Sequence, residues 1–102
     1  MRNQTQCLLH VLKIEEEYMR DVVRCDKKAE FRINDRDYQV GDLIHFVKTD
    51  GTEFCSYFNL FRITHILNVR EIIRNQSNKV EDYVVLSIEK LEDPIPNKLE
   101  RR

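Results

Sequence analysis

The sequence predicts an α+β fold: a small β-barrel of five or six mainly antiparallel strands, with one or two helices, one of them covering an end. Short apolar or alternating segments of strand length recur along the chain and are separated by turn residues. One segment near the N-terminus has the apolar spacing of a helix. The 102 residues suffice for one core. We therefore expect a single domain over 1–102, with its core between about 7 and 91.

The N-terminal part predicts a strand followed by a helix. Cys7–Ile14 is short, apolar and bounded by polar residues, as is typical of a buried strand. In Glu15–Arg24 the period changes, because apolar and aromatic residues recur at helical spacing. The three glutamates that open this segment favour the positive end of a helix dipole.

The next segment predicts a second strand. Lys28–Asn34 alternates, so that Phe31 and Ile33 share one face, whereas Glu30 and Arg32 share the other. Turn residues follow in 34–37 and 40–42.

Three further apolar stretches predict the remaining strands, which we place in Leu43–Thr49, in Phe54–Val69 as one or two strands, and in Tyr83–Lys90. Asp50 and Gly51 are a strong hairpin signal after the first of these stretches.

In the second stretch we expect Phe61, Ile63 and His65 on one face. The polar stretch 68–79 is expected to be weakly helical or a loop. Pro94 and Pro96 end regular structure, and 92–102 is expected to form a flexible tail.

Composition excludes several classes of protein. Lys and Arg total 17 against 18 Asp and Glu, so the net charge of -1 excludes nucleic-acid binding by bulk charge alone. No apolar run approaches the roughly 20 residues that span a bilayer, and the N-terminus lacks the apolar stretch of a signal peptide. We therefore expect a cytoplasmic protein without a membrane partner, and by default a monomer.

The three cysteines are widely spaced and form no CxxC or Cys/His cluster. We expect reduced thiols, with Cys7 and Cys55 partly buried, and neither a metal site nor an organic cofactor.

The segment 25–42 is dense in charges of both signs. Glu30 and Arg32 would lie on the same strand face, about 7 Å apart along the chain. An arginine fork suits a phosphate or a base edge, and a carboxylate suits an amine donor on a base. An exposed strand face with ordinary ion pairs is the alternative interpretation, and spacing alone leaves both open.

This segment resembles the ASCH domain of the PUA-like superfamily, whose signature is G-x-K-x-x-E-x-R. The matching positions are Cys25, Lys27, Glu30 and Arg32. Flanking segments resemble a small, largely uncharacterised ASCH-like family of bacteria and phages. Residues 10–14 are similar to its H-x-L-K-I opening, residues 34–42 to its N-D-R-D-[FY]-x-x-G-D segment, and residues 83–88 to its closing strand.

The resemblance implies a PUA-like barrel with a cleft beside the first helix, and binding of RNA or a modified nucleoside. Lys27, Glu30 and Arg32 would line the cleft. Other expected contributors are His10 and Lys13 from the first strand and Asn34, Asp35 and Arg36 from the turn. Most aromatic residues are expected in the core, but Tyr18 and Tyr38 flank the charged segment and are our choices for stacking a base.

Several alternatives remain open. Some ASCH proteins resemble amidohydrolases acting on acetylated cytidine, for which Lys27 with Glu30 or Glu89 would do the acid–base work, although Glu30 stands where that branch has a threonine. A protein-interaction module of phage or mobile-element origin is a third hypothesis. His10 also suits a core position. The basic residues between 62 and 79 would form a phosphate-binding strip or a solvated face.

Overall fold

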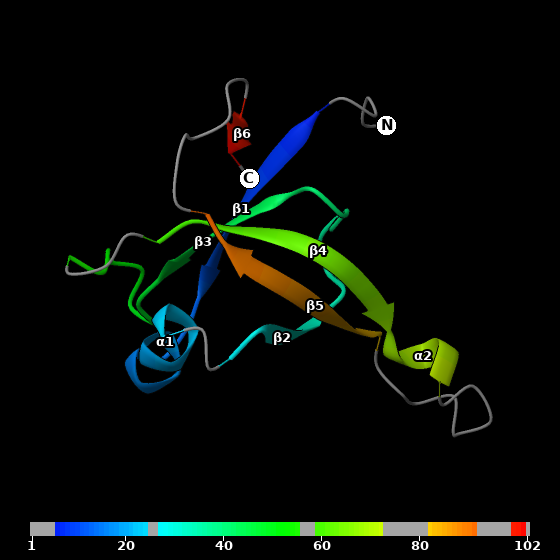
Figure 1. The fold of residues 1–102 in the computed structure, drawn as a ribbon, viewed down its shortest axis with the longest axis horizontal. Coiled ribbons are helices and arrows are strands. Elements are labelled where there is room, and N and C mark those ends of the chain that lie inside the picture. The colour runs from blue at the N-terminus through cyan, green and yellow to red at the C-terminus, as the bar shows by residue number, and fades with distance from the viewer. Residues whose placement is uncertain (1–5, 25–26, 56–58, 73–81, 92–98, 102) are drawn as a thin grey trace.

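The computed structural model describes residues 6–24, 27–55, 59–72, 82–91 and 99–101. Within them, six strands form one sheet, and two helices accompany it (Figure 1). The strands are β1 (Cys7–Lys13), β2 (Ala29–Ile33), β3 (Leu43–Val47), β4 (Phe61–Asn68), β5 (Tyr83–Lys90) and β6 (Leu99–Arg101), and the helices are α1 (Glu16–Val23) and α2 (Val69–Ile72). The predicted α+β class is confirmed.

The sheet is mixed and has the strand order β2-β5-β4-β3-β1-β6. Antiparallel pairs join β2 to β5, β5 to β4 and β4 to β3, whereas β1 runs parallel to both β3 and β6. Parallel neighbours need a long connection, which the segment 14–42 supplies between β1 and β3. In the described residues β2 and β6 stand at opposite ends of the order, so the pairing leaves the sheet open and does not confirm a barrel.

The C-terminal segment differs from the predicted flexible tail. Leu99–Arg101 forms β6, which pairs in parallel with Cys7–Leu9 of β1. These three residues, two of them charged, have no sequence pattern typical of a strand. Their strand conformation therefore depends on pairing with the edge of β1, and their own sequence does not predict it. Residues 92–98 and 102 lie outside the described part of the chain.

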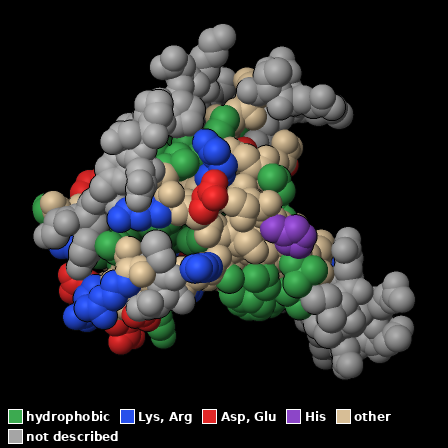
Figure 2. All heavy atoms as spheres, in the orientation of Figure 1, with side chains coloured by type: hydrophobic (Ala, Val, Ile, Leu, Met, Phe, Trp, Pro, Cys, Tyr) green, Lys and Arg blue, Asp and Glu red, His purple; other side chains and the backbone are tan. Residues whose placement is uncertain are grey.

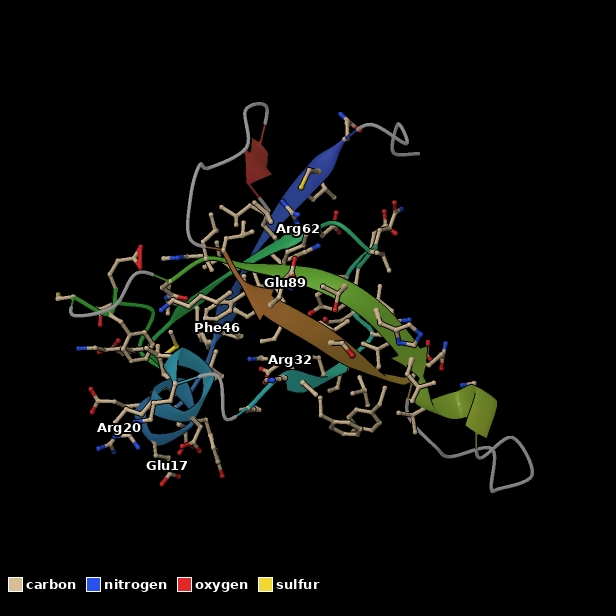
Figure 3. The ribbon with its side chains drawn as sticks, viewed as in Figure 1. Glu17, Arg20, Arg32, Phe46, Arg62 and Glu89 are labelled. Carbon is tan, nitrogen blue, oxygen red and sulfur yellow. The ribbon has the colours of Figure 1, made fainter. Side chains whose placement is uncertain are left out.

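Helix α1 confirms the predicted helix and covers part of the core. Met19 and Val22 are buried in the same cluster as Phe46 and Phe61, whose ring centroids lie 5.5 Å apart. On the opposite side of the helix, Glu17 and Arg20 point away from the sheet (Figure 3).

Strand β4 contains a bulge that changes which residues face inward. Phe61 and Ile63 are buried as expected, but the register with β5 shifts between Ile63 and His65. His65 is therefore exposed, and the prediction that it shares their face is wrong. In the polar stretch that follows, α2 begins at Val69, and residues 73–79 lie outside the described part.

The predicted turn at Asp50 and Gly51 is confirmed. The Gly51 amide donates to the Lys48 oxygen at 2.8 Å, and Gly51 has φ +87°, which a residue with a side chain rarely adopts. Of the cysteines, Cys7 is half-buried as expected. Cys55, which follows this turn, is exposed rather than partly buried.

Strand β2 buries its charged face and exposes its apolar face, the reverse of the usual arrangement. Glu30 is 3% exposed, whereas Phe31 is 57% and Ile33 49% exposed. The predicted alternation is confirmed, but Phe31 is an exception to the expectation that most aromatic residues lie in the core, because the charged face of this strand points inward. Glu30 and Arg32 lie opposite Leu86 and Val84, which are both buried. A buried carboxylate requires partners, which the next section describes.

Candidate functional site

The carboxylate of Glu30 is the centre of the candidate site. Its Oε1 receives Lys27 Nζ at 2.5 Å, and its Oε2 receives Arg32 Nε at 2.7 Å and Nη2 at 2.5 Å. The Glu30 side chain is 4% exposed, whereas those of Lys27 and Arg32 are 32% and 24% exposed. The two cations thus neutralise a buried carboxylate and still reach solvent.

Arg32 also joins β2 to the first strand. Its Nη2 donates to the backbone oxygen of Lys13 at 2.7 Å, at the end of β1. Figure 3 shows the Arg32 side chain extending from β2 into the space beside that end. Both N–H groups on Nη1 are without a hydrogen-bond partner among the described residues. Arg32 therefore keeps donors available for a ligand.

Helix α1 contributes an aromatic ring to the same site. Lys27 Nζ lies 5.5 Å from the centroid of the Tyr18 ring, within the range of a cation–π contact. Tyr18 is 49% exposed. The ring thus borders the charged cluster and remains accessible, as expected for a residue that stacks a base.

These residues line a cavity of about 1160 Å³. It lies between the end of β1, the start of α1, strand β2 and the turn that follows β2. Its wall has four basic and three acidic side chains, which are Lys13, Lys27, Arg32, Arg36, Glu15, Glu30 and Asp35. Four aromatic residues complete it: Tyr18, Phe31, Tyr38 and Tyr83. The cavity wall therefore carries charges of both signs, as the sequence predicted, and aromatic side chains.

Seven of the nine expected site residues line this cavity: Lys13, Tyr18, Lys27, Glu30, Arg32, Asp35 and Arg36. Asn34 is exposed and does not line it; its backbone amide donates to the Asp82 oxygen at 2.7 Å. His10 does not line it either. Cys25, which replaces the signature glycine, lies outside the described residues.

His10 is a core residue, which corrects its assignment as a cleft donor. It is fully buried, and its Nε2 lies 2.8 Å from Oδ2 of the buried Asp42. Asp42 also accepts the amides of Leu8 at 3.2 Å and Gln39 at 3.0 Å. Sequence reasoning missed this pair, although an aspartate directly after a turn glycine is a usual acceptor for backbone amides.

Tyr38 connects this buried pair to the cavity. Its ring centroid lies 4.8 Å from that of His10, and Tyr38 is buried, so it does not present a free face for a base. Burial raises the pKa of Tyr38 above its ordinary value of 10.0, and Asp35 and Glu30 add to the increase, against the opposing effect of Arg36 and Arg32.

The basic stretch and Glu89 lie away from this cavity. Arg62 is 4.0 Å from Glu89, and both side chains are exposed. Arg70 lies 3.6 Å from Asp82. Arg74 and Lys79 lie outside the described residues. Because Glu89 does not line the cavity, it cannot act with Lys27 there.

Fold and site define a small α+β domain with a mixed-charge cavity beside α1. Residues 9–88 match the model of a family described as Domain of unknown function (DUF3850), and the chain belongs to this family. No curated protein matches the chain. Among the described residues there is no group of three or more potential metal ligands, and no helix has the length and apolarity needed to cross a membrane.

Proposed function

We propose that the cavity binds RNA or a modified nucleoside. The observation that supports this proposal most strongly is the buried Glu30 carboxylate between Lys27 and Arg32. A carboxylate fixed in this way holds a guanidinium in one orientation, so its remaining donors can recognise a phosphate or a base edge without first being ordered. Tyr18 supplies an accessible ring beside these donors.

Two further cations support a phosphate contact. Lys13 and Arg36 line the cavity and are exposed, and neither forms an ion pair with another described residue. Their charges are therefore available to an anion. Since the wall also carries three acidic groups, only a few phosphates would be held. We expect the logarithm of the affinity to fall with the logarithm of salt concentration with a slope of about one to three contacts.

A PUA-like barrel with a cleft beside the helix remains our proposal for the finer architecture. The hydrogen bond from Arg32 to Lys13 supports it, because three strands stand between β2 and β1 in the sheet order. A sheet that lets one side chain cross between such distant strands is strongly curved.

Calorimetric titration of the full chain tests the binding proposal. The probes are the four nucleoside monophosphates, N4-acetylcytidine and a single-stranded RNA of eight nucleotides. Arg36→Ala removes an exposed cation from the cavity wall, and Arg62→Ala is the matched control outside it. We expect binding of at least one probe to weaken about tenfold in Arg36→Ala and to stay unchanged in Arg62→Ala. Equal losses in both variants, or no binding of any probe, would overturn the proposal.

An amidohydrolase acting on an acetylated nucleoside is a second candidate function. It is favoured by the 2.5 Å contact between Lys27 and Glu30 on the cavity wall. In such a reaction water adds to the acetyl carbon, the C–N bond breaks, and acetate and the free amine form. Both oxygens of Glu30 already accept from cations, so taking a proton from water would require an ion pair to open. Chromatographic detection of cytidine from N4-acetylcytidine, lost in Lys27→Met, would establish this function over simple binding.

A further inference from the structure

The outer face of β2, β5 and β4 carries exposed apolar side chains. Ile33 lies opposite Tyr83, and Phe31 and Leu67 both lie opposite Val85, so these five residues share one side of the sheet. We call them the outer apolar face. Figure 2 shows hydrophobic side chains gathered where β2 meets the start of β5. Phe31, Ile33 and Leu67 are exposed and Tyr83 and Val85 are half-buried, so this face is a candidate interaction surface.

Two flat rings dominate this face. Phe31 and Tyr83 stack with their centroids 4.8 Å apart and their planes 17° from parallel. Phe31 nevertheless remains 57% exposed, the largest exposed fraction of any aromatic side chain in the described residues. A stacked pair with one open ring face presents a flat platform, which suits a planar partner better than it suits aliphatic side chains.

The platform is continuous with the charged cavity. Phe31 and Tyr83 belong to the lining of the same cavity as Glu30 and Arg32. Strand β2 is at the end of the sheet order, and its residues alternate between the two sides. A ligand held by Arg32 on the inner side would therefore pass over the open edge of β2 and meet Phe31 on the outer side.

We infer that the ligand of this protein is a single-stranded nucleic acid of at least two nucleotides. One nucleotide occupies the cavity at Lys27, Glu30 and Arg32, and a neighbouring base stacks on Phe31. This inference rests on the proposed function and extends it from a single nucleoside to a strand. Charge complementarity supports the choice of partner, because the exposed cations Lys13 and Arg36 line the cavity that adjoins the platform and would meet backbone phosphates.

The test compares a mononucleotide with oligonucleotides by calorimetry. The probes are cytidine monophosphate, an eight-nucleotide single-stranded RNA and DNA of the same sequence. Phe31→Ala removes the platform, Phe31→Leu keeps an apolar side chain without a flat ring, and Phe31→Tyr keeps the ring. Val40→Ala is the control, since Val40 is 62% exposed and lies outside the cavity lining. These exposed positions allow each variant to fold.

We expect Phe31→Ala and Phe31→Leu to weaken octanucleotide binding by roughly 5- to 150-fold, as loss of one stacked base does, and Phe31→Tyr and Val40→Ala to leave it unchanged. Binding of cytidine monophosphate should be unchanged in Val40→Ala. In Phe31→Ala and Phe31→Leu it should weaken by a much smaller factor than octanucleotide binding does, because the mononucleotide lacks the base that stacks on Phe31. Equal loss with RNA and DNA supports recognition by stacking and phosphate, and loss with RNA alone supports the same platform with added 2′-hydroxyl contacts.

Three results would overturn the inference. If octanucleotide affinity is the same in Phe31→Ala as in the unmodified chain while cytidine monophosphate binds, the platform is wrong and the proposed function stands. If none of the three probes binds, the inference fails, and the proposed function fails with it when N4-acetylcytidine and the other three nucleoside monophosphates do not bind either. If sedimentation shows a dimer that Phe31→Ala dissociates and nucleic acid leaves intact, the outer apolar face serves a second copy of this chain.

Discussion

The side chain of Arg32 on β2 holds the backbone oxygen of Lys13 at the end of β1, at an Nη2–O distance of 2.7 Å. These two strands are not neighbours in the sheet, and the same guanidinium also binds Glu30. The Arg32 side chain thus connects the end of β1 to Glu30 in the cavity wall.

Replacing Arg32 by lysine tests this link. A lysine is a single point donor, so it cannot bind Glu30 and the Lys13 oxygen with the planar fork of arginine. We expect Arg32→Lys to lower the free energy of unfolding by about 1–2 kcal/mol, measured by urea denaturation. Arg62→Lys, whose exposed side chain is 4.0 Å from its partner, is the control and should change it by less than about 0.5 kcal/mol. Equal effects would show that the fork geometry is unimportant.

Removing the charge of Glu30 tests the buried ion pairs. Glu30→Gln leaves Lys27 and Arg32 close together without a neutralising carboxylate. The expected loss is about 2 kcal/mol, between the values for surface and fully buried pairs, because both cations are partly exposed. Glu89→Gln removes an exposed carboxylate and serves as the matched control. A loss no larger than that of the control in urea denaturation would contradict this account of the site.

Asp42 is expected to be the most sensitive carboxylate in the described part of the chain. Asp42→Ala deprives the buried His10 Nε2 and Leu8 amide, and the part-buried Gln39 amide, of their acceptor. We expect a loss of at least about 3 kcal/mol or failure to fold, since each abandoned buried group costs about 1–3 kcal/mol. Asp35→Ala, at an exposed position, should retain near-native stability, and circular dichroism melting separates the two.

Tyr38 makes stability fall at alkaline pH. Burial raises its pKa in the folded state, so below pH 10 both states keep the proton and stability is unaffected. Above its ordinary pKa of 10.0 the unfolded chain releases the proton while the folded chain retains it, and stability therefore decreases as pH rises. In Tyr38→Phe the slope of unfolding free energy between pH 10 and 11 should be shallower than in the unmodified chain.

The control for this experiment is Tyr18→Phe, because the Tyr18 ring is half-exposed to solvent. An equally shallow slope in both variants would show that burial of Tyr38 is not the cause.

Local sequence patterns predicted most elements but not their arrangement. The strand at Ala29–Ile33 follows from its alternation, and the strands at Cys7–Lys13 and Tyr83–Lys90 follow from short apolar stretches of strand length. The parallel pairing of β1 with β3 depends on which distant segments meet, and no local period encodes it. β6 was missed for the same reason, since only the edge of β1 makes Leu99–Arg101 a strand.

The candidate site was predicted in part. Lys27, Glu30 and Arg32 were predicted to lie together because they are close in the sequence: Glu30 and Arg32 share β2, and Lys27 precedes that strand by two residues. The inward direction of Glu30 did not follow, because the usual rule places Phe31 inside. His10 and Asp42 lie far apart in the sequence, and their pairing was visible only in the fold.

The position of β1 has a consequence for how the chain acquires its structure. Both neighbours of β1, the strands β3 and β6, come later in the sequence. During synthesis, β1 therefore waits, with Leu8 and Leu12 uncovered, until β3 has been made. We expect nascent chains that stop before Leu43 to aggregate or to recruit a chaperone, because β1 still lacks its neighbour β3. The ion pairs that Glu30 forms with Lys27 and Arg32 are made earlier but do not cover β1.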